Sequence, residues 1–285
     1  MRRPLLAASV ILIAAAGSAW DAPGHRAVSV VAVDQLSERV ATSWLGDHEV
    51  RSAVAFQSNE PDRYRGTPSA VLNHENGPDH YIDLELLAKH DLTLRSLPRL
   101  RYEFVAQLAR TSSMPKPESG PDGKPARRGV DHRTFTDDVG FVPYAIVEHH
   151  AKLVSSFTTL RILEGLNDPQ RAIQLAAARA NVLHEMGQLS HFVADAAQPL
   201  HTTIHHHGWV GANPDSFTTD RGFHAYIDGE IVAFHGITEA EIAEAAKERL
   251  AITDASLWDE VLALIERSHA AVRPLYTMHK DGSLR

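Results

Sequence analysis

Apolar residues recur at helical spacing along most of this chain, and no segment shows the sustained apolar–polar alternation of a half-buried strand. Between residues 28 and 45, for example, Val28, Val31 and Leu36 share one face, and Gly46 follows as a stop signal. The pattern therefore predicts an all-α protein. The expected helices cover residues 28–45, 99–108, 142–163, 170–193, 239–250 and 257–271.

Two segments lack this helical pattern. Residues 57–80 are rich in Asn, Pro, Gly and His, which predicts a long loop. Residues 112–136 contain four prolines and three glycines but few apolar residues, so we expect a mobile surface loop there. No internal repeat or heptad array divides the chain. Its 285 residues, 44% of them hydrophobic, are enough for a single helical domain with one sizeable core.

The first 19 residues have the layout of a secretory signal peptide. Arg2 and Arg3 precede an apolar run over residues 5–16 that is too short to span a bilayer, and the small residues 17–19 follow. Cleavage there would leave residues 20–285 as one domain that begins at Trp20, and the mature protein would be secreted or periplasmic. The alternative is an uncleaved membrane anchor.

The composition limits the chemistry. The absence of cysteine excludes disulfides, thiolate metal sites and a cysteine nucleophile. The 18 histidines suggest metal binding or proton transfer. After signal cleavage, 26 basic residues would face 36 acidic ones, so the overall charge would not attract a polyanion such as DNA. A phosphate-ester substrate would therefore need a local source of positive charge.

The segment 191–201, HFVADAAQPLH, holds the densest group of residues capable of chemistry. His191 and Asp195 lie four residues apart at the end of a predicted helix, which places both on one face. Pro199 cannot continue that helix, and the resulting turn can direct His201 toward the same cavity. Nitrogen and oxygen ligands without sulfur suit zinc in a hydrolytic site.

Further candidate ligands lie outside this segment. His224 and Asp228 are again four residues apart, although that spacing alone is weak evidence in a chain with 18 histidines. After signal cleavage, the α-amino group and carbonyl oxygen of Trp20 could form a five-membered chelate ring with a metal, and His25 lies five residues further on. The remaining candidates are Asp62 and the segment 80–83, His-Tyr-Ile-Asp.

In this order, the residues resemble the superfamily of zinc-dependent phospholipases C and single-strand-specific zinc nucleases. Members of this superfamily are secreted, mainly helical, and bind three zinc ions at the bottom of a cleft. The resemblance is confined to short segments, and residues 85–181 resemble nothing specific. It implies nine ligand residues for three zinc ions: Trp20, His25, Asp62, His80, His191, Asp195, His201, His224 and Asp228.

The resemblance also implies which residues share each zinc ion. Asp62, His80, His191 and Asp195 would hold the first; His201, His224 and Asp228 the second; and Trp20 with His25 the third. Asp195 would bridge the first and third ions. A hydroxide bridging these two zinc ions would attack phosphorus, and the second ion would offset the developing negative charge. The catalytic candidates are Asp62 and Arg65, the latter as a phosphate contact or, alternatively, an ordinary surface arginine.

Within the superfamily, the ligand spacing resembles the nuclease branch. The short step from Trp20 to His25 and the 23 residues between His201 and His224 are both nuclease-like. The substrate-binding candidates are Tyr81, on which a base could stack, and Asp83, which could accept hydrogen bonds from the base edge. Tyr81 packed beside the metal site is the alternative. The chain departs from the family in lacking disulfides and in having Glu-Pro before Asp62, where the nucleases usually have Trp-Ala.

These inferences predict a secreted zinc hydrolase that cleaves phosphodiester bonds of single-stranded nucleic acids and 3′-nucleotides and that requires no protein partner. A phospholipase C that cleaves phospholipid head groups is the first alternative. A non-catalytic zinc-binding protein, suggested by the histidine excess, is the second. His205, His206 and His207 are expected to be exposed to solvent in a loop rich in Gly and Asn, and the alternative is that one of them touches the substrate.

Overall fold

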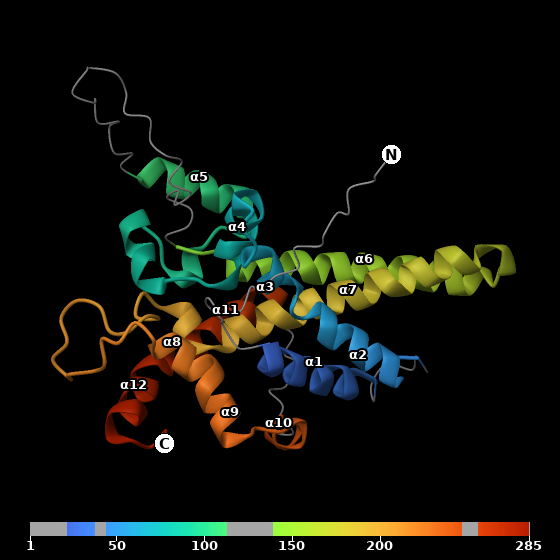
Figure 1. Cartoon of the computed structure of the whole chain (residues 1–285). Helices are drawn as coiled ribbons and strands as arrows, with labels where there is room; N and C mark the ends of the chain where they lie inside the picture. The colour runs from blue at the N-terminus through green and yellow to red at the C-terminus, as the bar shows by residue number, and fades with distance from the viewer. Residues whose placement is uncertain (1–21, 38–43, 113–138, 247–255, 285) are drawn as a thin grey trace, which may run out of the picture.

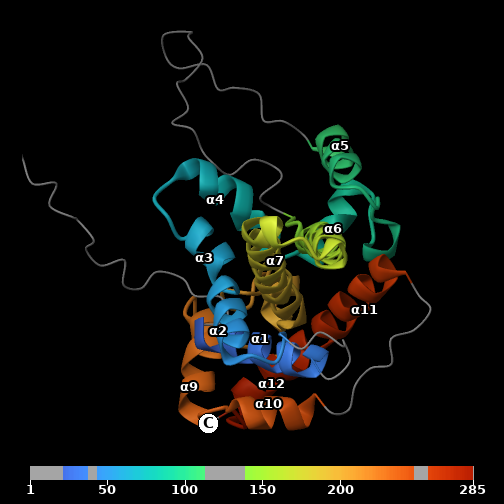
Figure 2. The same cartoon turned by 90° about the vertical axis from the view of Figure 1, so that its right-hand side faces the viewer.

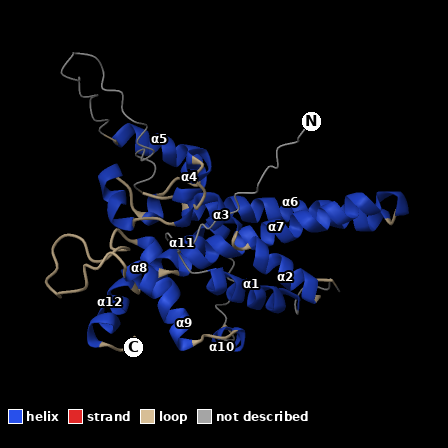
Figure 3. Cartoon of the chain, in the orientation of Figure 1, coloured by secondary structure: helices blue, strands red, loops and turns tan. Residues whose placement is uncertain are grey.

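The computed structural model describes residues 22–37, 44–112, 139–246 and 256–284, and these form helices joined by loops (Figure 1, Figure 3). Within these ranges there is no strand, only an isolated antiparallel bridge between Ile82 and Gly140. The prediction of an all-α protein is confirmed. The predicted signal peptide, Trp20 and nearly all of the predicted loop 112–136 lie outside the described ranges.

The helices follow one another along the chain with few long interruptions. The α-helices are α1 (Ala22–Ser37), α2 (His48–Gln57), α3 (Glu60–Arg65), α4 (Ala70–Asn76), α5 (Arg101–Thr111), α6 (Val142–Leu166), α7 (Ala172–Ala197), α8 (Phe223–Ala225), α9 (Ile231–His235), α10 (Glu239–Ala245), α11 (Leu257–Ala270) and α12 (Val272–Asp281). The 3₁₀-helices are η1 (Gly77–His80), η2 (Leu84–His90), η3 (Leu94–Ser96), η4 (Pro169–Arg171) and η5 (Pro199–Thr202), and η6 (Tyr226–Glu230) is a π-helix.

The two longest helices, α6 and α7, form an antiparallel hairpin that runs through the molecule (Figure 1). Asn167 ends α6 in a left-handed conformation, with a φ of 47°. Figure 2 looks along the hairpin, with α1 and α2 below it and α11 beside it. Among the described residues, no helix is both long enough and apolar enough to cross a bilayer.

Three apolar clusters pack the helices together, and the first of them includes Phe192 and Ala196 in the last turns of α7. One lies between α5, α6, α7 and α11 and contains stacked Phe104 and Tyr144. A second joins the outer part of the hairpin to α1 and α2 through residues such as Leu160 and Val182. The third lies around Tyr276 of α12. Because close-packed interiors restrict side-chain rotation, these clusters hold the end of α7 firmly.

The prediction of a long loop over residues 57–80 is wrong. These residues form the end of α2, then α3, α4 and η1. Pro61 and Pro78 each lie in the first two positions of a helix, where proline's missing N–H has no intrahelical partner to lose. Ser69 caps α4 by accepting a hydrogen bond from the N–H of Leu72. Pro61 and Pro78, which indicated a loop in the sequence, therefore lie at the starts of helices.

Other helix boundaries differ from the prediction by smaller amounts. Helix α1 begins at Ala22, six residues before the predicted start, and the described part of the predicted helix 239–250 ends at Ala245. Helix α7 extends to Ala197, four residues beyond the predicted end at residue 193, and the chain turns at Pro199 as expected, where the proline opens the 3₁₀-helix η5. Helices α8, α9 and α12 and the π-helix η6 were not predicted.

Candidate metal centre

Eight of the nine candidate ligands lie in the described part of the chain, and they come from seven different elements. Trp20 lies outside it. The fold brings all eight into one connected set of contacts, in which each residue touches at least one other member. The members are His25 of α1, Asp62 of α3, His80 of η1, His191 and Asp195 of α7, His201 of η5, His224 of α8 and Asp228 of η6.

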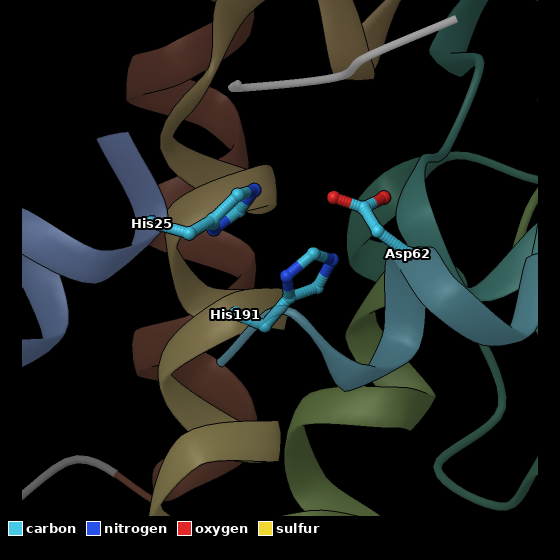
Figure 4. A group of neighbouring side chains, drawn as sticks. All are labelled: His25, Asp62 and His191. Atoms are coloured by element: carbon cyan, nitrogen blue, oxygen red, sulfur yellow. The ribbon is translucent and has the colours of Figure 1, made fainter. Parts of the chain in front are cut away.

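The first group is His25, Asp62 and His191, whose ligand atoms lie within 4.8 Å of one another. The imidazole of His25 stacks on that of His191, with 3.9 Å between ring centroids and 18° between planes. Figure 4 shows the Asp62 carboxylate on the other side of a gap, facing both rings. One carboxylate and two imidazoles thus converge from three helices.

The second group is His80, His191 and Asp195, and all three side chains are buried. The Oδ2 atom of Asp195 lies 2.9 Å from Nδ1 of His80 and 3.1 Å from Nε2 of His191. Its Oδ1 atom lies 3.2 Å from Nδ1 of His201 and 3.5 Å from Nε2 of His25. Asp195 therefore joins the three groups, as a bridging ligand would.

The third group is His201, His224 and Asp228. The Nε2 atoms of the two histidines are 3.1 Å apart, and Nε2 of His224 is 2.7 Å from Oδ2 of Asp228. Ligand atoms around a tetrahedral zinc ion with bonds of about 2.0–2.1 Å are separated by roughly 3.3 Å. The remaining pair, Nε2 of His201 and Oδ2 of Asp228, is 3.9 Å apart, so the separations in this group lie on both sides of that value.

Backbone carbonyls orient two of the imidazoles. Nδ1 of His191 donates to the carbonyl of Ser58 at 2.7 Å, and Nδ1 of His201 donates to the carbonyl of His80 at 2.8 Å. When the ring is neutral, each of these bonds leaves the lone pair on Nε2, the atom that faces the other candidate ligands. Metal-binding histidines are commonly oriented in this way.

A cation would remove an unfavourable contact in the second group. Because Nδ1 of neutral His191 donates to Ser58, its Nε2 lone pair faces the Asp195 carboxylate at 3.1 Å, so two acceptors lie against each other. A proton or a metal ion between these atoms would turn the repulsion into attraction. The donor set therefore fits a metal ion, and the buried His and Asp groups could hold metal ions.

The pKa directions agree with ligands ready for a cation. Burial lowers the pKa of His25 and His80 well below the usual range, which favours the neutral rings that a metal ion requires. Burial opposes the ionisation of Asp195, but His191 and His201 hold its pKa well below the ordinary value. Burial raises the pKa of Asp62 despite the neighbouring Arg65.

In the third group, burial opposes charge on both partners, and their mutual attraction overcomes it. The pKa of Asp228 falls to about 2 beside His201 and His224. The pKa of His201 rises to about 10 because Asp195 and Asp228 flank it. Without a metal ion, a proton on His201 supplies the positive charge that these carboxylates require. A bound cation would take over that role.

The remaining predicted site residues lie around these groups. Nε of Arg65 donates to Oδ1 of Asp62 at 2.8 Å, so the arginine is paired with a candidate ligand. Tyr81 is half-buried next to His80, and its carbonyl accepts from the N–H of Val142 at 3.1 Å. Asp83 is buried, with Oδ1 3.9 Å from Nδ1 of His206.

Sequence reasoning missed several residues that support the site. Gln198 donates through Nε2 to Oδ1 of Asp228, and its own Oε1 accepts from the N–H of Leu200 at 3.1 Å. Asn59 holds the first turn of α1, accepting from Nε of Arg26 at 2.8 Å and donating to the carbonyl of Ala22 at 3.4 Å. Gln198 lies inside the motif HFVADAAQPLH, so its position was a usable signal. No sequence pattern indicates the contacts of Asn59.

Comparison of the chain with models of protein families, with curated proteins and with solved structures gave no match. The class of protein is therefore defined by the fold and the site alone. The chain is an all-α protein in which buried histidine and aspartate groups at the end of the longest helix could hold metal ions.

Proposed function

We propose that this protein is a zinc-dependent hydrolase that cleaves phosphodiester bonds of single-stranded nucleic acids and 3′-nucleotides. One observation carries the proposal: seven elements bring eight candidate ligands into a single set of contacts centred on Asp195. Structural metal sites usually fill the coordination of one ion with four ligands. Eight histidine and aspartate ligands in three overlapping groups instead suit neighbouring ions that leave positions open for a substrate.

Zinc is the metal that the donor set favours. All the candidate side chains offer imidazole nitrogen or carboxylate oxygen, the combination found in hydrolytic zinc sites. Two carbonyls already hold His191 and His201 in the orientation that directs Nε2 inward. We assign Trp20 as a further ligand. Ala22, two residues after Trp20, supports this assignment, because its carbonyl accepts a hydrogen bond from Asn59, which lies three residues before Asp62.

When bound, zinc would supply a Lewis acid and an activated water molecule at neutral pH. The chain's own residues prepare the site for a phosphate ester. Asp195 fixes the relative positions of four imidazoles, and the Arg65 guanidinium lies beside Asp62 at the half-exposed side of the site. The local positive charge that an acidic protein needs for a phosphate substrate would come from the metal ions and Arg65.

The test uses the full chain expressed with its N-terminal segment. We expect a mature N-terminus at Trp20, three zinc ions per chain by elemental analysis, and hydrolysis of single-stranded DNA that is lost on chelation and restored by zinc. Asp34→Asn, a half-exposed surface residue paired with Arg51, serves as a control and should change neither zinc content nor rate.

Parallel assays separate the proposed function from its alternatives. Faster hydrolysis of phosphatidylcholine than of single-stranded DNA would identify a phospholipase C. Three bound zinc ions with no turnover of any phosphodiester would indicate a zinc-binding protein. Fewer than two zinc ions in correctly processed protein would contradict the proposal altogether.

A further inference from the structure

The loop that follows η5 brings two histidines against the third group. The ring of His207 lies 5.4 Å from that of His224, and the ring of His206 lies 6.1 Å from it, measured between centroids. The two rings also meet each other edge-on, with 4.5 Å between centroids. The expectation that these histidines simply extend into solvent is therefore incomplete, because both contact a candidate metal ligand.

This loop is held in place by contacts on both sides. Glu85 accepts hydrogen bonds from the hydroxyl of Thr203 and, at 3.1 Å, from the N–H of Ile204. The hydroxyl of Tyr276 donates to the carbonyl of His205. The ring of His205 stacks on Trp209 with 3.9 Å between centroids and 6° between planes, which turns His205 away from its two neighbours in the sequence.

Gly208 fixes the direction in which the loop leaves the site. Its φ is +88°, a conformation that L-residues rarely adopt. A Cβ atom there would lie 2.6 Å from the backbone carbon of Thr219, so a side chain would clash with backbone. The N–H of Trp209 then donates to the carbonyl of Thr218 at 2.8 Å. The glycine thus lets the chain turn immediately after His207, against a second segment.

The two histidines lie where solvent reaches the metal centre. Of the eight candidate ligands that the structure describes, six are buried, and only Asp62 and His224 keep 23% and 15% of their side-chain surface exposed. Solvent therefore reaches the candidate ligands at Asp62 and at His224. Arg65 lies beside Asp62, and His206 and His207 lie beside His224.

The two rings offer different hydrogen-bonding atoms. Nδ1 of His206 donates to the carbonyl of Thr203 at 3.0 Å, which leaves this ring no free N–H when it is neutral. His207 is exposed, and its ring makes no hydrogen bond within the described part of the chain, so a ring N–H is available to a ligand.

We propose that His207 binds a phosphoryl oxygen of the substrate at the His224 end of the metal centre, and that His206 positions the His207 ring. The ligand class is a phosphate ester or inorganic phosphate held between the third group and this N–H. The inference rests on the proposed function for the presence of zinc, but it concerns substrate binding rather than the chemical step. His207 is thus a substrate-binding residue opposite Arg65.

The test separates loss of the N–H from loss of the ring. His207→Phe keeps an aromatic ring against His206 and removes the donor, whereas His207→Gln keeps a donor without the ring. Because a hydrogen bond to a charged group contributes about 1.5–3 kcal/mol, we expect His207→Phe to weaken binding of inorganic phosphate to the zinc-loaded protein by about tenfold or more. We expect His207→Gln to recover most of that affinity.

Calorimetric titration with inorganic phosphate gives the dissociation constant, and elemental analysis gives the zinc content of each variant. His235→Phe, at an exposed histidine of α9, is the matched control and should bind phosphate like the wild type. In hydrolysis assays, His207→Phe should raise KM by a similar factor and leave kcat within about twofold.

The other possible results of phosphate titration and zinc analysis also decide the inference. Unchanged phosphate binding in His207→Phe would overturn it, and so would loss of zinc in that variant, which would make His207 a metal ligand. Phosphate binding that neither variant alters, or that the wild type lacks, would also overturn it. If the wild type binds zinc and phosphate but hydrolyses no phosphodiester, the proposed function fails while the ratio of dissociation constants still decides the role of His207.

Discussion

The second group and the third group hold similar ligands by different means. His191 and Asp195 of the second group lie on α7, a helix of 26 residues whose end is surrounded by packed apolar side chains. His224 and Asp228 of the third group lie at the start of a continuous helical stretch over residues 223–235, formed by α8, the π-helix η6 and α9, in which the π-helical turn begins at Tyr226. The first pair is completely buried, whereas His224 is partly exposed.

This difference indicates which contacts maintain the relative positions of the ligands in each group. On α7, a spacing of four residues places both ligands on one face, and the packed helix preserves that relation. In α8 and η6, the four-residue spacing is set by the passage from α-helix to π-helix, and the bond from Gln198 to Asp228 adds a contact with another segment. The second group should therefore resist changes in its surroundings better than the third, and loss of its own ligands should cost more.

The largest effect is expected for Asp195→Asn. This substitution removes the carboxylate that four imidazoles approach within 3.5 Å. Breaking a buried ion pair by removing one partner commonly costs about 3–5 kcal/mol. We expect that loss of unfolding free energy in the metal-free protein, together with loss of most bound zinc, measured by denaturant unfolding and elemental analysis. Zinc content equal to that of the wild type would contradict the central place given to Asp195.

The next largest loss of activity is expected for Asp62→Asn, which should affect stability differently. Because burial raises the pKa of Asp62, its ionised form is less favourable in the folded chain than in the unfolded one. Its contribution to stability is therefore present below the unfolded pKa and lost as the pH rises through the folded pKa. At neutral pH, the metal-free variant should be at least as stable as the wild type, and this advantage should disappear in acid.

Activity should respond to Asp62→Asn in the opposite direction. A weakened first group should lower zinc content by about one ion and reduce hydrolysis by about 100-fold or more. Thermal unfolding of the chelated protein over a range of pH, together with zinc analysis, checks both statements. A variant that is less stable than the wild type at neutral pH and retains full activity would show that Asp62 is structural.

The difference between the groups also explains what the sequence could predict. The periodicity of α7 and the break at Pro199 are local, so the fold class, the pairing of His191 with Asp195 and the turn to His201 could all be predicted from neighbouring residues. The candidate ligands were identified from their order along the chain, and the structure brings the eight described ones together.

What could not be predicted depends on contacts between distant segments. The carbonyl of Ser58 orients His191 over a separation of 133 residues, and backbone carbonyls have no sequence signature. The helices between residues 57 and 80 were missed because proline breaks a helix in its interior but is favourable in its first turn, where Pro61 and Pro78 lie. The contacts of His206 and His207 with His224 likewise depend on the turn at Gly208.

A smaller effect is expected for Gly187→Ala, which tests the second group without touching a ligand. A Cβ at Gly187 would lie 2.4 Å from Cβ of Gln57 and 2.9 Å from the backbone nitrogen of Ser58, so α2 must move away from α7. Overpacking of this kind costs about 1–3 kcal/mol. Displacing the Ser58 carbonyl from His191 should also weaken zinc binding by about tenfold.

Gly165→Ala provides the matched control for that substitution. Gly165 lies in α6, and a Cβ there would meet nothing within 4 Å. Replacing a helical glycine by alanine in open space should stabilise the protein by about 0.5–1 kcal/mol. Equal effects of the two substitutions on stability and zinc affinity would mean that the close approach of α2 to α7 does not support the second group.

The smallest effect is expected for Gln198→Ala, which tests the third group by removing a supporting side chain. The substitution deletes the donor to Oδ1 of Asp228 and the acceptor of the Leu200 N–H. Loss of one such hydrogen bond costs about 1 kcal/mol, so the protein should remain folded. If the third group needs support from outside its own helix, zinc affinity should fall about tenfold at the third group and stay unchanged at the second, measured by competition with a chelator. Gln174→Ala on exposed α7 surface should change neither, and a uniform loss at all groups would show that the two are held by one common framework.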